Sequence, residues 1–170
     1  MRLEDYIRDI PDFPKQGIIF KDITPLLMDP AALGEAVGRI YDRFKDKGVS
    51  KVVAIESRGF IFGGPLALKL NAGFVPVRKP GKLPFKTKRE EYELEYGTDA
   101  LEIHVDGVCG GEKILIVDDL LATGGTAEAT ARLVEQCGAK VVGFAFVIEL
   151  AFLDGRSKLK DYDVFSLIKY

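Results

Sequence analysis

The residues best suited to chemistry lie in the segment 114–126. Asp118 and Asp119 follow an apolar run, and a turn of small and hydroxylated residues, 122–126, comes directly after them. A glycine turn that opens a helix points unpaired N–H groups and the positive end of the helix dipole at one spot, which suits a phosphate. Neighbouring carboxylates accept hydrogen bonds from vicinal sugar hydroxyls or hold a hydrated Mg²⁺. Together these groups predict a site for a ribose 5-phosphate.

Two other interpretations fit part of this pattern. One is an ordinary turn between strand and helix, with solvated acids. The other is a receiver domain, which also carries paired aspartates after an apolar run, but which needs about a hundred further residues of alternating strands and helices. Only residues 120–170 follow the pair, so the second interpretation does not fit.

Composition limits the class of protein. The chain has 170 residues, is 47% hydrophobic and carries a net charge of −2, which fits one domain and gives no overall reason to expect a nucleic-acid partner. No apolar run approaches the length of a membrane span, so we expect no membrane partner and a soluble, cytoplasmic protein. Cys109 and Cys137 form no metal-binding spacing and are expected as reduced thiols. His104 falls on the polar side of a strand, where exposure is a better expectation than general-base catalysis.

The pattern of elements predicts an α/β fold in which strands alternate with helices. Pro11 ends a helix expected from Leu3, and Asp29 and Pro30 start a longer one that continues to Gly48. The other predicted elements are strands at 51–55, 74–77, 100–105, 114–117, 140–148 and 164–168, helices at 59–70 and 126–137, and a helical turn at 154–159.

A second polar turn follows the strand 51–55. Glu56, Ser57, Arg58 and Gly59 stand where that strand ends and the next helix begins. Ligands of open α/β sheets bind at the carboxyl ends of the strands, so Arg58 is predicted to face the same cleft as the acid pair.

The segment from Lys79 to Glu91 has a different composition from its surroundings. It holds two prolines, one glycine and five basic residues, with few apolar ones. Long irregular loops in compact domains are usually lids or binding loops. We therefore expect residues 79–95 to form a mobile lid that brings cations to an anionic ligand and excludes water.

The segment 114–126 resembles the 5-phosphoribosyl-1-pyrophosphate (PRPP) signature of the type I phosphoribosyltransferases. Four other segments, 13–25, 56–60, 78–84 and 94–97, resemble the adenine-specific members of that family, so the resemblance covers nearly the whole chain. Lys21 stands where many members are expected to have arginine.

The resemblance implies a fold, a reaction and partners. The fold is a central, mostly parallel β-sheet flanked by helices in a single domain of residues 1–170, with a small N-terminal hood of residues 1–30. The reaction transfers the 5-phosphoribosyl group from PRPP to adenine, giving AMP and pyrophosphate in purine salvage. Mg²⁺ is the implied cofactor, bound through PRPP oxygens, water and in part Asp118, and a homodimer is the implied assembly.

The resemblance also assigns roles to residues. The 5-phosphate is held by Ala122, Thr123, Gly124, Gly125 and Thr126, and the ribose hydroxyls by Asp118 and Asp119. Pyrophosphate is held by Ser57, Arg58, Arg78, Lys79 and Lys82, and one of the basic residues among them can come from a partner subunit. Adenine contacts Ile19, Phe20, Lys21 and Leu120. The implied catalytic residues are Glu95, Arg58 and Lys82, with Glu95 near N7 of the base for proton transfer.

Elementary chemistry agrees with these roles. Charge grows on the leaving group during glycosyl transfer, so cationic side chains are the expected catalysts. Adenine offers an acceptor at N1 and a donor at N6, a pattern that one backbone N–H and one C=O match.

Alternative functions remain open at this point. The same PRPP site could serve hypoxanthine, guanine or xanthine. A regulator that senses PRPP or purines without catalysis is a second alternative, but residues 1–30 lack the two helices of a helix-turn-helix. The basic cluster from Arg78 to Arg89 has Phe85 as its one interleaved aromatic, which argues against RNA binding.

Overall fold

The computed structural model describes residues 1–94 and 96–170. The chain forms two compact units, Met1–Arg39 and Ile40–Tyr170, and each is described separately below.

The first unit contains a small antiparallel hairpin. A 3₁₀ turn, Leu3–Tyr6, precedes β1 (Arg8–Pro11), which pairs with β2 (Ile19–Asp22), and α1 (Thr24–Met28) follows. The helix expected to run from Leu3 to Pro11 is therefore wrong beyond its first turn. Its second half forms the ladder with β2, and hydrogen bonds to another strand override the local apolar spacing.

The helix α2 (Pro30–Phe44) begins as the sequence predicts. An Oδ1 atom of Asp29 accepts hydrogen bonds from the backbone N–H groups of Ala31 and Ala32, both at 2.9 Å. Asp29 is thus the N-cap, and Pro30 occupies the first position, where a helix needs no N–H donor.

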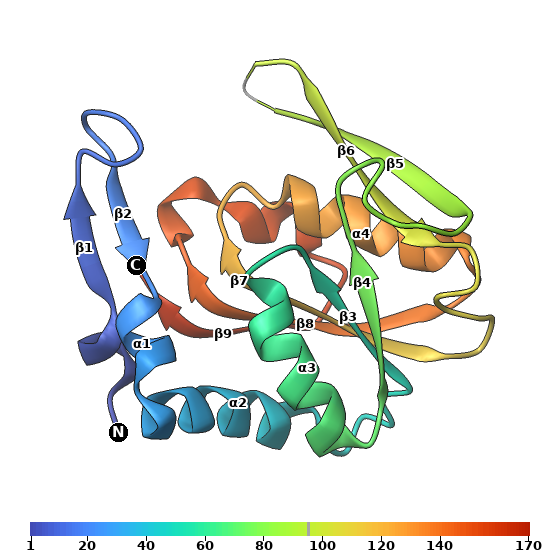
Figure 1. Ribbon diagram of the computed structural model, residues 1–170, viewed down its shortest axis with the longest axis horizontal. Helices are drawn as coiled ribbons and strands as arrows, with labels where there is room; N and C mark the ends of the chain where they lie inside the picture. The colour runs from blue at the N-terminus through green and yellow to red at the C-terminus, as the bar shows by residue number, and fades with distance from the viewer. Residues whose placement is uncertain (95) are drawn as a thin grey trace. The chain divides into compact units, whose positions relative to one another are not determined.

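The second unit is built on a five-stranded parallel sheet with the strand order β4-β3-β7-β8-β9 (Figure 1). The predicted central parallel sheet flanked by helices is confirmed. The strands are β3 (Lys51–Ile55), β4 (Gly73–Val77), β7 (Lys113–Leu121), β8 (Lys140–Glu149) and β9 (Val164–Lys169).

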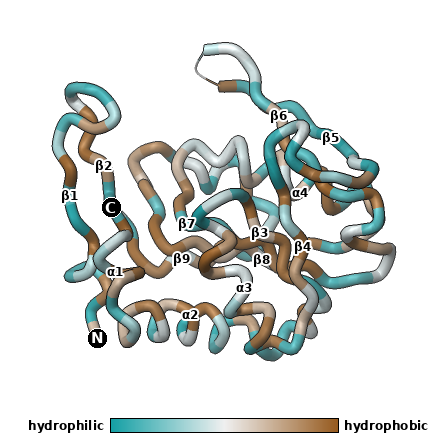
Figure 2. Tube along the Cα trace, viewed as in Figure 1, coloured by the Kyte–Doolittle hydropathy of each residue, from teal (hydrophilic) through white to brown (hydrophobic). Residues whose placement is uncertain are grey.

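Two helices cover opposite faces of this sheet. The helix α3 (Gly59–Leu70) packs on β3, β4 and β7, whereas α4 (Gly125–Gln136) packs on β7 and β8. Val53 belongs to the core cluster that includes α4, while the neighbouring Ala54 faces Gly63 of α3. Since successive residues of a strand point to opposite faces, the sheet is buried on both sides. Figure 2 accordingly shows hydrophobic residues along its central strands.

A two-stranded antiparallel ribbon replaces part of the expected loop. β5 (Thr87–Glu93) pairs with β6 (Thr98–His104), and Figure 1 shows the ribbon projecting beyond the sheet. The expectation of an irregular segment up to Glu91 is therefore wrong from Thr87 onward. Two charged residues of β5 have partners on α4: Lys88 donates to the carbonyl of Gln136 at 2.9 Å, and the Gln136 side chain donates to Glu90 at 2.6 Å.

Short 3₁₀ turns complete the second unit. They are η2 (Ala151–Leu153) and η3 (Gly155–Leu159), which lie between β8 and β9.

Across the described residues, no helix has both the length and the apolar character needed to cross a bilayer. The Nε2 atom of His104 accepts a hydrogen bond from the N–H of Phe85 at 3.3 Å, so this histidine has a structural contact outside the predicted site.

Asp22 gives a test of the hairpin that carries three of the predicted adenine contacts. Its carboxylate accepts hydrogen bonds from the Thr24 hydroxyl at 2.6 Å, from the Thr24 N–H at 2.9 Å and from Arg8 at 2.7 Å. These contacts lower the pKa of Asp22 to about 2. Because the folded pKa lies below the usual value, the stabilisation is full above about pH 4 and is lost as the pH falls toward 2.

Asp22→Asn should therefore destabilise the chain at pH 7, and its deficit should shrink between pH 4 and 2. Urea unfolding at several pH values measures the effect, with Asp46→Asn, a change at an exposed carboxylate, as the control. A deficit that is the same at pH 7 and pH 2 would show that the charge of Asp22 does not hold the hairpin.

Candidate active site

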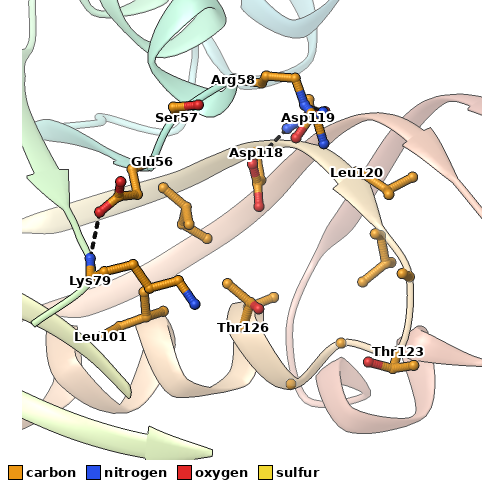
Figure 3. A pocket seen from close by; sticks show the side chains of 16 residues that line it. Glu56, Ser57, Arg58, Lys79, Leu101, Asp118, Asp119, Leu120, Thr123 and Thr126 are labelled. Atoms are coloured by element: carbon orange, nitrogen blue, oxygen red, sulfur yellow. Dashed lines mark hydrogen bonds and ion pairs between the residues drawn. The ribbon is translucent and has the colours of Figure 1, made fainter. Parts of the chain in front are cut away.

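A cavity of about 430 Å³ lies at the carboxyl ends of β3 and β7 (Figure 3). Its lining consists of residues 55–58, residues 118–127, Lys79 and Leu101. The two polar turns that the sequence places after separate strands therefore meet at one edge of the sheet, as expected for an open α/β fold.

One wall is the turn between β7 and α4. Gly124 has a positive φ of 85°, and α4 starts at Gly125. Within the described chain no side chain caps this helix, so the first N–H groups of α4 are not taken up by a cap. An uncapped helix start that lines a cavity is suited to an anion, which agrees with the predicted role of residues 122–126.

The floor is the acid pair. β7 does not end before the acids, as the sequence suggested, but continues through Leu121. Asp119 is only 8% exposed, and its carboxylate accepts a hydrogen bond from Arg58 Nε at 2.6 Å. Asp118 keeps part of its surface on the cavity, and its Oδ1 accepts the N–H of Asp119 at 2.9 Å. Burial, and then the neighbouring Asp119 carboxylate, raise the pKa of Asp118 well above its usual range.

Gly59 lets the helix that follows Arg58 approach this floor. A Cβ atom at Gly59 would lie 3.0 Å from both Asp118 Oδ1 and the carbonyl oxygen of Val117. A side chain here would force these neighbours to shift by a few tenths of an ångström, so glycine suits the close approach of α3 to β7. The position of Arg58 against Asp119 depends on that approach.

Lys79 brings a cation to the opposite side of the cavity. Its N–H donates to Glu56 at 2.5 Å (Figure 3). Its ammonium contacts the carboxylate of Asp99 and the hydroxyl of Tyr92, the latter at 3.2 Å. Burial opposes the charged form of Lys79, but the hydrogen bonds to Asp99 and Tyr92 outweigh it and raise its pKa. Lys79 is therefore charged at neutral pH.

The other predicted pyrophosphate residues divide into two groups. Ser57 lines the cavity beside Arg58, whereas Arg78 and Lys82 are not among the lining residues of the described chain. Arg78 forms an ion pair with Glu56 at 3.5 Å, and its Nε is buried without a hydrogen-bond partner in the described structure. The roles of Arg78 and Lys82 stay predictions.

The predicted adenine residues and proton-transfer residue have different locations. Leu120 lines the cavity, while Ile19, Phe20 and Lys21 form most of β2 in the first unit. Glu95 lies outside the described residues.

Some residues of this region were given no role from the sequence. Glu56 anchors Lys79 and Arg78, Asp99 holds the Lys79 ammonium, and Leu101 adds an apolar wall. Glu56 was detectable because it directly follows a buried strand. Asp99 and Leu101 carry no signal, since their place depends on the pairing of β6 with β5.

The carboxylates of the cavity suit a divalent metal ion that binds together with the substrate. In the described chain no three His, Cys, Asp or Glu side chains come together as a metal site. Asp118 and Asp119 provide hard oxygen atoms beside the turn, and Mg²⁺ typically binds one or two carboxylates together with phosphate oxygens and water. The acid pair could therefore contribute to a Mg²⁺ ion held mainly by substrate oxygens.

The sheet, the uncapped glycine turn and the acid pair together define a phosphoribosyltransferase. Residues 26–169 match the family model described as "Phosphoribosyl transferase domain". The chain is 57% identical to the adenine phosphoribosyltransferase of Maridesulfovibrio salexigens over 169 residues, covering 99% of each chain.

Solved structures agree with this match. The crystal structure of adenine phosphoribosyltransferase from Thermoanaerobacter pseudethanolicus is 55% identical, with a TM-score of 0.96 over 99% of this chain and 98% of that one. The Saccharomyces cerevisiae enzyme, solved with adenine and an imino-altritol bisphosphate, is 43% identical, with a TM-score of 0.92 and coverage of 97% and 96%. The chain belongs to the adenine phosphoribosyltransferase family.

Gly124 provides a test of the phosphate site predicted at the turn of residues 122–126. A Cβ atom there would lie 2.6 Å from the carbonyl oxygen of Gly155, at a φ that L-residues rarely adopt. Gly124→Ala should displace the turn and weaken ribose 5-phosphate binding, measured by calorimetry, by roughly tenfold or more. Gly64→Ala, where an added Cβ meets nothing within 4 Å, is the control and should bind normally. Equal binding by both variants would contradict a phosphate site at this turn.

Proposed function

We propose that this protein transfers the 5-phosphoribosyl group from PRPP to adenine, producing AMP and pyrophosphate in purine salvage. The observation that carries the proposal is that the glycine turn, the acid pair, Arg58 and Lys79 line one cavity. Membership of the adenine phosphoribosyltransferase family supports the choice of base.

The sugar phosphate is proposed to lie between the turn and the acids. The N–H groups of residues 123–126 and the hydroxyls of Thr123 and Thr126 bind the 5-phosphate, where the dipole of α4 favours negative charge. Asp118 and Asp119 accept the hydroxyls of the ribose. Burial and the neighbouring charge of Asp119 both disfavour the charged form of Asp118. Hydrogen bonds donated by the ribose hydroxyls would stabilise that charged form.

The leaving group is proposed to lie toward Ser57, Arg58 and Lys79. The bond between ribose C1 and the pyrophosphate oxygen breaks as the bond from adenine N9 to C1 forms, so negative charge grows on pyrophosphate. Fixed cations stabilise that charge more in the transition state than in the ground state. Arg78 and Lys82 are proposed to join them, and Mg²⁺ bound to substrate oxygens would neutralise part of the same charge.

The base contacts are proposed from the resemblance of the sequence. Leu120 lines the cavity and offers an apolar surface to a purine ring. Ile19, Phe20 and Lys21 are proposed to contact adenine, with main-chain groups reading N1 and N6. Glu95 is proposed to take part in proton transfer near N7.

A homodimer and a cytoplasmic location belong to the same proposal. The homodimer rests on the family resemblance alone. The location is supported by Cys109 and Cys137, which are both free thiols, as in proteins of reducing compartments.

A comparison of bases tests the function. The protein is given PRPP and Mg²⁺ with adenine, hypoxanthine, guanine or xanthine in parallel, and pyrophosphate release is followed. Adenine should react with a kcat/KM roughly 10⁴-fold above the others, because a wrong base leaves buried polar groups unpaired. A faster reaction with a 6-oxopurine would show that adenine is not the preferred substrate. No reaction with any base would contradict the proposed transferase activity.

The acid pair provides a second test. Asp118→Asn combined with Asp119→Asn keeps the size of both side chains but removes two acceptors with charge, so kcat/KM for PRPP should fall by at least about 10²-fold. Asp106→Asn combined with Asp161→Asn makes the same change in net charge at exposed positions and should retain activity. Circular dichroism checks folding, and unchanged kinetics in a folded double variant would refute the role of the acids.

A further inference from the structure

The phosphate-binding turn rests against a segment outside the cavity lining. Gly155, the first residue of η3, contacts the backbone of this turn, and a Cβ atom added at either Gly124 or Gly155 would collide with the main chain of the other segment. An added Cβ at Gly155 would also lie 2.9 Å from the side chain of Leu121. The two backbones are therefore packed without intervening side chains, and a shift of η3 displaces the turn.

The neighbouring residue fixes η3 to the sheet. Arg156 donates from Nε to Glu149 Oε1 at 2.7 Å and from Nη2 to Glu149 Oε2 at 2.9 Å, a two-pronged ion pair. Its Nη1 also donates to the carbonyl oxygen of Val164 at 3.0 Å. Arg156 thus joins η3 to the end of β8 and the start of β9.

The carboxylate of this pair is unusual for its depth. Glu149 is 4% exposed, which few carboxylates tolerate without a partner. The geometry of the planar guanidinium fixes both direction and distance, which a single ammonium contact does not. The pair therefore sets where Gly155 lies, although neither of its side chains lines the cavity.

We propose that the Arg156–Glu149 ion pair is a positioning element of the reaction, which aligns the 5-phosphate-binding turn by holding Gly155 against Gly124. The inference rests on the proposed function, since it assigns the turn to the 5-phosphate. Hydrogen-bond donors must be placed within a fraction of an ångström to act fully, so loosening of η3 weakens phosphate binding while the pyrophosphate side is spared.

The test compares two ligands that occupy different ends of the cavity. The experiment titrates three proteins, the wild type, Arg156→Met and Arg156→Lys, with ribose 5-phosphate and, separately, with pyrophosphate and Mg²⁺. The dissociation constants are calculated from the concentration of folded protein in each sample. Arg156→Met should weaken ribose 5-phosphate binding and raise the KM for PRPP about tenfold or more, with pyrophosphate affinity within about twofold. Arg156→Lys should recover part of the loss, because an ammonium replaces only one prong.

Arg43→Met is the matched control. Arg43 is also paired with a carboxylate, since its Nη2 donates to both oxygens of Asp163 at 2.6 Å, but Asp163 and Arg43 are not part of η3 or the turn. Its loss should leave ribose 5-phosphate affinity unchanged. If Arg156→Met does not fold, the double variant Glu149→Gln with Arg156→Met removes both charges and is held to the same expectation.

The possible results separate the two ideas. Wild-type binding of ribose 5-phosphate with no selective loss in the folded Arg156 variants would overturn the positioning role alone. Equal weakening of both ligands would also overturn it, because a general loss of structure does not distinguish the two ends. A wild type that binds pyrophosphate but not ribose 5-phosphate would overturn the proposed function and this inference together.

Discussion

The negative charges of two adjacent carboxylates, Asp118 and Asp119, must be balanced by a cation, and the site in the second unit depends on this constraint. Asp118 and Asp119 lie in the last half of β7, a strand of a sheet that is buried on both faces, and like charges so close together repel each other. Arg58 meets this requirement at 2.6 Å from Asp119. It can do so only because β3 and β7 are parallel neighbours, with Ala54 paired to Val117, so that the residues after both strands share one edge. The pairing of β3 with β7 therefore also places Arg58 beside Asp119.

The same edge provides a second kind of site through the backbone. The turn before α4 has no capping side chain in the described chain, and Gly124 adopts a positive φ that suits glycine. Such a turn binds an anion with N–H groups whose direction is fixed by the fold. Acids that can accept hydrogen bonds from hydroxyls and amides that can donate to a phosphate therefore lie side by side on β7 and α4. This juxtaposition is what a sugar phosphate requires and what an ordinary turn does not need.

Much of this arrangement could be predicted from local patterns. Apolar runs predict the buried strands at 51–55 and 114–117, and the pair Asp29 and Pro30 predicts the start of α2. Because ligands of open α/β sheets bind at the carboxyl ends of the strands, the sequence also predicts that Arg58 and the acid pair share one cleft. These features succeed because each depends on a few neighbouring residues or on a general property of parallel sheets.

Features that depend on distant pairing could not be predicted in the same way. β5 is rich in charged residues, as a surface loop would be, and it becomes a strand through its ladder with β6 and its contacts with α4. Residues 8–11 have helical spacing, yet they pair with β2. The contact of Lys79 with Glu56 requires the pairing of β3 with β4, and its contact with Asp99 requires β6 to lie beside the end of β4. Sequence patterns describe which side chains are available, and tertiary pairing decides which of them meet.

The most direct measurement is a crystal structure of the protein with AMP bound. The proposed arrangement predicts the phosphate within hydrogen-bond distance of the N–H groups of residues 123–126, and both ribose hydroxyls on the carboxylates of Asp118 and Asp119. AMP bound with its phosphate elsewhere, or with its ribose hydroxyls turned away from both carboxylates, would contradict the central claim.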